Sequence, residues 1–104
     1  MQEQQSGKII VHVDPDLKDL IPGYLANRKK DIAAIHDAIE KNDLDTIRIL
    51  GHSMKGSGGG YGFETITDIG MMMETAAKEG RNEEIRLQMK RLEDYLRWVE
   101  IVYG

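Results

Sequence analysis

The amino-acid sequence predicts an all-α fold, an antiparallel up-down four-helix bundle with a short extra N-terminal helix. Apolar residues recur every three or four positions through four long segments, which is the period of a helix with one buried face. The links between these segments are two to five residues long, and short links favour antiparallel neighbours. The chain has 104 residues and no cysteine, so it is most simply one domain whose core is not held by disulfides.

The chain begins with a tail that we place at residues 1–13, before a helical domain at residues 14–104. Residues 1–7 are polar, and we expect them to be frayed. Residues 8–13 form a short apolar run rich in β-branched side chains. Such a run is either extended along the domain or a marginal strand.

The first helix signal is Asp14 followed by Pro15, because a capping side chain before a proline at the first helical position favours a helix start. Pro22 then either interrupts this helix or begins a second one. The apolar stripe of the segment that ends near Asn42 consists of Leu25, Ile32, Ile35 and Ile39. Asn42 or Asp43 is suited to cap the next helix.

The next helix carries a histidine on its polar side. At about 100° per residue, one buried stripe is formed by Leu44, Ile47, Leu50, Gly51 and Met54. His52 projects away from that stripe, beside Arg48 and Lys55, so we expect it to be exposed.

Two further helices complete the predicted bundle. The first has an apolar stripe that consists of Phe63, Ile66, Ile69, Gly70, Met73 and Ala77. We expect this helix to end near Gly80, and the last one to begin at Asn82. The stripe of that last helix consists of Ile85, Met89, Leu92, Leu96, Val99 and Tyr103.

Composition excludes several classes of function. The net charge is −4 with basic and acidic residues interspersed, so the chain lacks the basic patch of a nucleic-acid-binding protein. It has no apolar run of the ~20 residues that a membrane span needs, and no signal-peptide pattern, so we expect a cytoplasmic protein. The three histidines His12, His36 and His52 do not have metal-ligand spacing, and we predict no metal or cofactor site.

The chemistry of the chain is concentrated at His52, Lys55 and Gly56. Residues three and four apart share one side of a helix, so these three lie together. An exposed imidazole titrates near pH ~6.5 and is largely a neutral nucleophile at pH 7. A lysine one turn away offers its charge to phosphoryl oxygens, and a glycine leaves room for a partner. This arrangement favours a phosphoryl carrier on histidine.

The residues after this group have two readings. The run Gly58-Gly59-Gly60 is expected to end the helix and form a turn, while Gly62 is expected to let two helices approach closely. Ser57 either reaches the phosphoryl group or bonds a backbone carbonyl, and its sequence position leaves both open.

The run His52-Ser53-Met54-Lys55-Gly56-Ser57, followed by Tyr61-Gly62-Phe63, resembles the histidine-containing phosphotransfer (HPt) domain family. The resemblance covers residues 14–104. It implies that His52 is the phosphoacceptor, that Lys55 stabilises the phosphoryl group and that Gly56 gives access. It also implies a carrier without its own ATP-binding site, because members exchange phosphoryl groups with receiver domains.

By this resemblance the partner is a response-regulator receiver domain, whose aspartate exchanges the phosphoryl group and which supplies Mg²⁺. A related alternative is the phosphoacceptor module of a chemotaxis-type histidine kinase, fed by the ATP-binding domain of that kinase. From a different class, the chain is a helical interaction module that is not phosphorylated. Under any of these we place the partner surface at Arg48, Ile49, Gly59 and Met71, and we expect a monomer.

Overall fold

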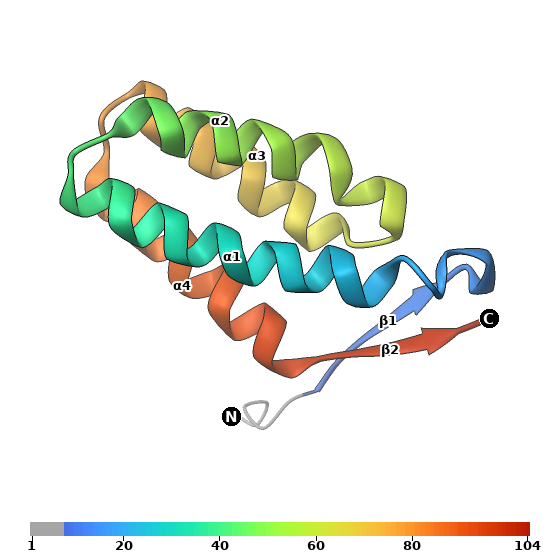
Figure 1. The fold of residues 1–104 in the computed structure, drawn as a ribbon. Coiled ribbons are helices and arrows are strands. Elements are labelled where there is room, and N and C mark those ends of the chain that lie inside the picture. The colour runs from blue at the N-terminus through green and yellow to red at the C-terminus, as the bar shows by residue number, and fades with distance from the viewer. Residues whose placement is uncertain (1–7) are drawn as a thin grey trace.

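The computed structural model describes residues 8–104, which form four long helices and two short strands (Figure 1). The helices are α1 (Ile21–Glu40), α2 (Leu44–Ser57), α3 (Glu64–Lys78) and α4 (Asn82–Trp98), and the strands are β1 (Ile9–Val13) and β2 (Val99–Tyr103). Two 3₁₀ turns are η2 (Pro15–Leu17) and η3 (Gly59–Tyr61). The prediction of a mostly helical chain with four main helices is confirmed, whereas the predicted fraying of residues 1–7 lies outside the described residues.

The helices pack side by side around one core. Figure 1 shows α2 and α3 together on one side of the molecule, with α1 and α4 on the other. The α1–α2 and α3–α4 links lie at one end, and the α2–α3 link lies at the opposite end, near β1. The interface between α2 and α3 is the most extensive in the described part of the chain, so the helix that carries His52 is positioned chiefly by α3.

The predicted short N-terminal helix is only one 3₁₀ turn. The Asp14 side chain accepts a hydrogen bond of 2.9 Å from the Asp16 backbone N–H, so the predicted cap is present. The turn ends at Leu17, and α1 begins at Ile21 with Pro22 in its first turn. The segment between the two prolines is too short to offset the cost of helix nucleation. Of the two readings of Pro22, the structure shows that it begins a second helix.

The prediction that the last helix continues to Tyr103 is wrong. This helix, α4, ends at Trp98, and β2 pairs with β1 in parallel, from Ile9 opposite Val99 to Val13 opposite Tyr103. Alternate residues of β2 are partly buried against the core, and its β-branched side chains favour a strand. The apolar run at residues 8–13 is therefore a strand, with Val13 in the core.

An aromatic cluster joins the helices at the end of the bundle near the sheet. Phe63 is fully buried, stacks on Tyr24 with ring centroids 5.7 Å apart, and meets the edge of Tyr95 at 6.5 Å. Tyr24 also stacks on Tyr61 at 4.4 Å. These rings bury a large apolar area and connect α1, the turn after α2, the start of α3, and α4. Within residues 8–104, no helix is long and apolar enough to cross a membrane.

Candidate functional site

The local sequence sets where α2 begins and which face it buries. The Asp43 side chain accepts a 3.1 Å hydrogen bond from the Thr46 backbone N–H, which caps the helix. Of the predicted stripe, Ile47, Gly51 and Met54 are buried. The side chain of His52 is 67% exposed, as predicted, so a reacting group on a partner has access to its ring.

Gly51 and Gly70 allow the middle turns of α2 and α3 to touch backbone to backbone, and Gly58 allows the same contact at the end of α2. A Cβ atom on Gly70 would lie 2.5 Å from the Lys55 backbone nitrogen and 2.6 Å from the Gly51 carbonyl oxygen. A Cβ on Gly51 would lie 2.7 Å from the Glu74 backbone nitrogen. Real Cβ atoms do not approach so closely, so only glycine fits. This contact brings Glu74 of α3 beside the turn of α2 that carries His52.

Glu74 is the centre of the site. Its carboxylate oxygen Oε2 lies 3.0 Å from His52 Nδ1, and its Oε1 lies 2.8 Å from Lys55 Nζ. The second lysine of the site, Lys78, has its Nζ 3.7 Å from Oε2. The side chain of Glu74 is only 9% exposed, so these partners offset the cost of holding a carboxylate away from water.

The surrounding cations keep Glu74 ionised. The hydrogen bond that Glu74 accepts from Lys55 is the largest cause, and the hydrogen bond that it accepts from His52 and the charge of Lys78 add to it, so the pKa of Glu74 falls from 4.5 to about 2. A carboxylate only accepts hydrogen bonds, and His52 Nδ1 must therefore donate. In the neutral ring this leaves the Nε2 lone pair unprotonated and free to attack an electrophile.

Gly56 and Ser57 have different environments. A Cβ on Gly56 would meet nothing within 4 Å, which agrees with the predicted open surface beside His52. The Ser57 hydroxyl lies 2.9 Å from the Tyr24 hydroxyl and accepts a 3.4 Å hydrogen bond from Arg28 Nη1. Of the two sequence-based readings of Ser57, the bond to a backbone carbonyl is wrong, because its side chain is bonded to α1. Contact with a phosphoryl group stays a prediction.

The glycines after α2 act in part as predicted. Gly58 ends the helix, and a 3₁₀ turn follows it. Gly62 does not bring two helices together, because a Cβ there would meet only His12 and Val13 of β1, at 3.6 Å. It ends the turn with a φ of +94°, a conformation that favours glycine. The close helix contacts belong instead to Gly51 and Gly70, and to Gly58, on which a Cβ would lie 2.7 Å from the Thr67 backbone nitrogen of α3.

The predicted partner residues lie on α2, on α3 and in the turn between them. Ile49 and Met71 are exposed, with 53% and 47% of their surface accessible. Ile49 is one turn before His52, and Met71 is one turn before Glu74, so both are close to the site. Arg48 is paired with Asp45 at 2.7 Å, while Gly59 is exposed in η3.

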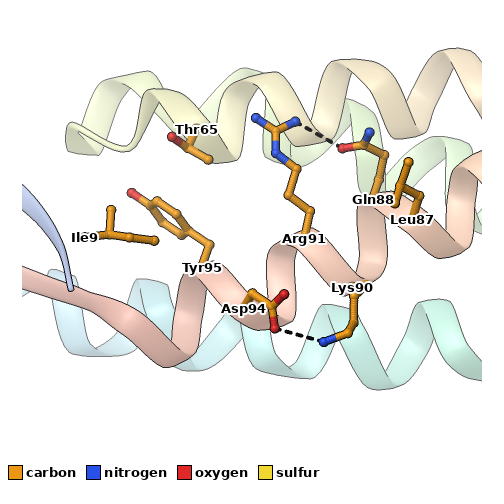
Figure 2. A pocket seen from close by; sticks show the side chains of 8 residues that line it. All are labelled: Ile9, Thr65, Leu87, Gln88, Lys90, Arg91, Asp94 and Tyr95. Atoms are coloured by element: carbon orange, nitrogen blue, oxygen red, sulfur yellow. Dashed lines mark hydrogen bonds and ion pairs between the residues drawn. The ribbon is translucent and has the colours of Figure 1, made fainter. Parts of the chain in front are cut away.

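A pocket on another part of the surface is separate from this site. Figure 2 shows it between β1, α3 and α4, with Tyr95 and Arg91 pointing into it. Its charged groups already have partners within the protein, since Lys90 bonds Asp94 at 3.1 Å and Arg91 bonds Asp68 at 2.9 Å. The residues that line it do not include His52, Lys55 or Glu74.

Sequence reasoning missed Glu74. The signal was present, because Glu74 is four residues after Gly70 and next to Met73, and it therefore belongs to the buried side of α3. A glutamate on a buried stripe requires a partner. The identity of that partner depends on which helix packs there, which the spacing within α3 does not reveal.

The fold and the site define a small helical module with one exposed histidine, whose ring is oriented by the Glu74 carboxylate. The family model of the Hpt domain matches residues 19–100, most of the chain. The chain therefore belongs to the Hpt domain family, whose members are phosphocarrier modules of two-component signalling that interact with receiver domains and kinases. Comparison with curated proteins and with solved structures found no match.

Proposed function

We propose that this chain is a phosphorelay carrier, which accepts a phosphoryl group on His52 from the aspartate of a receiver domain and passes it to another. The observation that carries this proposal is the exposed His52 ring, whose Nδ1 is bonded to the ionised Glu74 at 3.0 Å. That bond orients the ring and leaves Nε2 as the nucleophile facing solvent.

The transfer is a displacement at phosphorus. The Nε2 lone pair forms the new N–P bond, the P–O bond to the donor aspartate breaks, and the aspartate leaves as a carboxylate. The His52 ring keeps its proton on Nδ1 and becomes positively charged, and the adjacent Glu74 carboxylate offsets that charge. The Lys55 ammonium, bonded to the other oxygen of Glu74, is close enough to attract the phosphoryl oxygens.

Access and docking follow from the surface around the ring. The absence of a side chain at Gly56 leaves the approach to His52 open. We propose that Ile49 and Met71, both exposed, make apolar contacts with the receiver, with Arg48 and Gly59 at the border of the contact. Phosphoryl transfer depends mainly on positioning and charge, so Mg²⁺ on the receiver is expected to complete the site.

The domain bounds, the oligomeric state and the cellular location belong to the same proposal. We take residues 14–104 as the phosphotransfer bundle, a monomer of antiparallel helices on which β1 packs. The helix links at alternate ends of the bundle support this arrangement (Figure 1). The cytoplasmic location stays a prediction.

The test is incubation with a phosphorylated receiver domain and Mg²⁺, with intact mass and the acid-labile, alkali-stable phosphate measured together. We expect uptake by the native chain and by His36→Gln, because His36 is an exposed histidine of α1 outside the site, and no uptake by His52→Gln. Uptake by His52→Gln would refute the proposal. Uptake only from a chemotaxis-type kinase would identify the alternative donor, and no uptake from either source would favour an unphosphorylated interaction module.

A further inference from the structure

Two lysines contact the Glu74 carboxylate in different ways. Lys55 Nζ lies 2.8 Å from Oε1, which is a full hydrogen bond, and its side chain is 39% exposed. Lys78 Nζ lies 3.7 Å from Oε2, with a side chain that is 59% exposed. A separation of 3.7 Å is beyond hydrogen-bond length, so Lys78 is attracted by charge without being bonded.

The two lysines lie on opposite sides of the carboxylate. Gly51 of α2 lies against Glu74, whereas Lys55 lies against Gly70, so residue numbers rise along α2 as they fall along α3. Lys55 is thus on the Gly70 side of Glu74, and Lys78, one turn after Glu74, is on the other. The oxygen that Lys78 approaches is Oε2, the same atom that accepts the hydrogen bond from the His52 ring.

We propose that Lys78 is a second phosphoryl-binding cation, which moves from Glu74 to the phosphoryl group once that group is on His52. This inference rests on the proposed function. Lys55 has to give up a 2.8 Å hydrogen bond to reach the phosphoryl oxygens, whereas Lys78 gives up only a loose charge contact. Lys78 is therefore the cation that reorients at lower cost.

The charges around the ring support the need for a second cation. A phosphoryl group brings about −1.5 to −2 charges at pH 7, beside the negative charge of Glu74. With the positively charged ring and Lys55, that cluster keeps a net charge of about −0.5 to −1. Lys78 brings the second positive charge within reach of the ring, and its exposed, flexible side chain allows it to follow the phosphoryl group.

The test compares Lys78→Met and Lys78→Arg with the control Lys90→Met. Lys90 is also an exposed lysine paired with an acidic residue within one turn, Asp94 at 3.1 Å, but on α4. We measure the initial rate of phosphoryl uptake from a phosphorylated receiver, and the pKa of the phosphoryl group on His52 by ³¹P NMR. A nearby cation favours the dianion, so its removal raises that pKa.

We expect Lys78→Met to slow uptake about two- to fivefold, the effect of an exposed charge pair, and to raise the phosphoryl pKa. Lys78→Arg is expected to restore both, and Lys90→Met to change neither. If Lys78→Met matches Lys90→Met while the native chain takes up phosphoryl, the inference is overturned and the proposed function stands. If the native chain takes up none, the proposed function fails and the inference fails with it.

Discussion

Replacing Gly70 with alanine tests whether the backbone contact between α2 and α3 holds the histidine site together. The new Cβ would lie 2.5 Å from the Lys55 backbone nitrogen, 2.6 Å from the Gly51 carbonyl oxygen and 2.8 Å from Met54 Cβ. Two of these atoms belong to the backbone of α2, so no side-chain rotation relieves the contact. The two helices have to separate by about 1 Å to restore ordinary van der Waals distances.

The expected loss of stability follows from two opposing terms. Overpacking a tightly packed interface costs about 1–3 kcal/mol, and a contact with rigid backbone on the facing helix belongs at the upper end. The higher helix propensity of alanine compared with glycine stabilises α3 by about 1 kcal/mol. Gly70→Ala is therefore expected to lower the free energy of unfolding by about 2 kcal/mol, which corresponds to about 10 °C in Tm for a domain of this size.

Urea denaturation followed by circular dichroism measures this change, with Gly23→Ala as the matched control. Gly23 lies in the first turn of α1, and a Cβ there would meet nothing within 4 Å, so this variant should be as stable as the native chain or more so. We expect Gly70→Ala also to slow phosphoryl uptake, because separation of the helices lengthens the 3.0 Å contact between Glu74 and His52. Equal stability of Gly70→Ala and Gly23→Ala would refute the packing argument.

Three further changes give separate tests. The pKa of Glu74 is lowered to about 2, so its ionised form stabilises the fold above pH 4.5. The difference in unfolding free energy between the native chain and Glu74→Gln should therefore shrink as the pH falls to 2. A difference that stays constant with pH in urea titrations would contradict this. Gly56→Leu should block uptake from a receiver while circular dichroism stays helical, and normal uptake would refute the role of access. Tyr24→Phe should lower the free energy of unfolding by about 0.5–1.5 kcal/mol, because the hydrogen bond to Ser57 is lost. Ser57→Ala should then destabilise the Tyr24→Phe variant less than it destabilises the native chain. An equal loss of stability in both would show that the bond contributes nothing.

Helix positions could be predicted from the sequence where local signals agree. The cap at Asp43, the start at Asn82 and the buried stripe of α2 are all present, because each depends on residues within one or two turns. The end of α4 could not be predicted, because local signals do not report contacts between distant parts of the chain. Val99 and Tyr103 fit the spacing of a helix, but their pairing with β1 joins the two ends of the described chain, and a local pattern does not contain that contact.

The candidate site likewise combines residues that a local pattern predicts with residues that it does not. His52, Lys55 and Gly56 share one face of α2, as their spacing predicts, and their roles in phosphoryl transfer stay predictions. Glu74 was missed because it comes from another helix, and its role depends on how closely Gly70 allows α3 to approach. The same applies to Ser57, whose partner Tyr24 lies 33 residues away in the sequence. Contacts between helices, rather than patterns within one helix, decide which polar side chains meet.

The position of the phosphoryl group on the imidazole ring is the most direct test of the proposed site. The ¹⁵N-labelled chain is phosphorylated by a receiver domain with Mg²⁺, and long-range ¹H–¹⁵N NMR correlations identify the modified nitrogen. We expect the phosphoryl group on Nε2 of His52, with the proton kept on Nδ1 by Glu74. A phosphoryl group on Nδ1, or on a residue other than His52, would contradict the proposed mechanism.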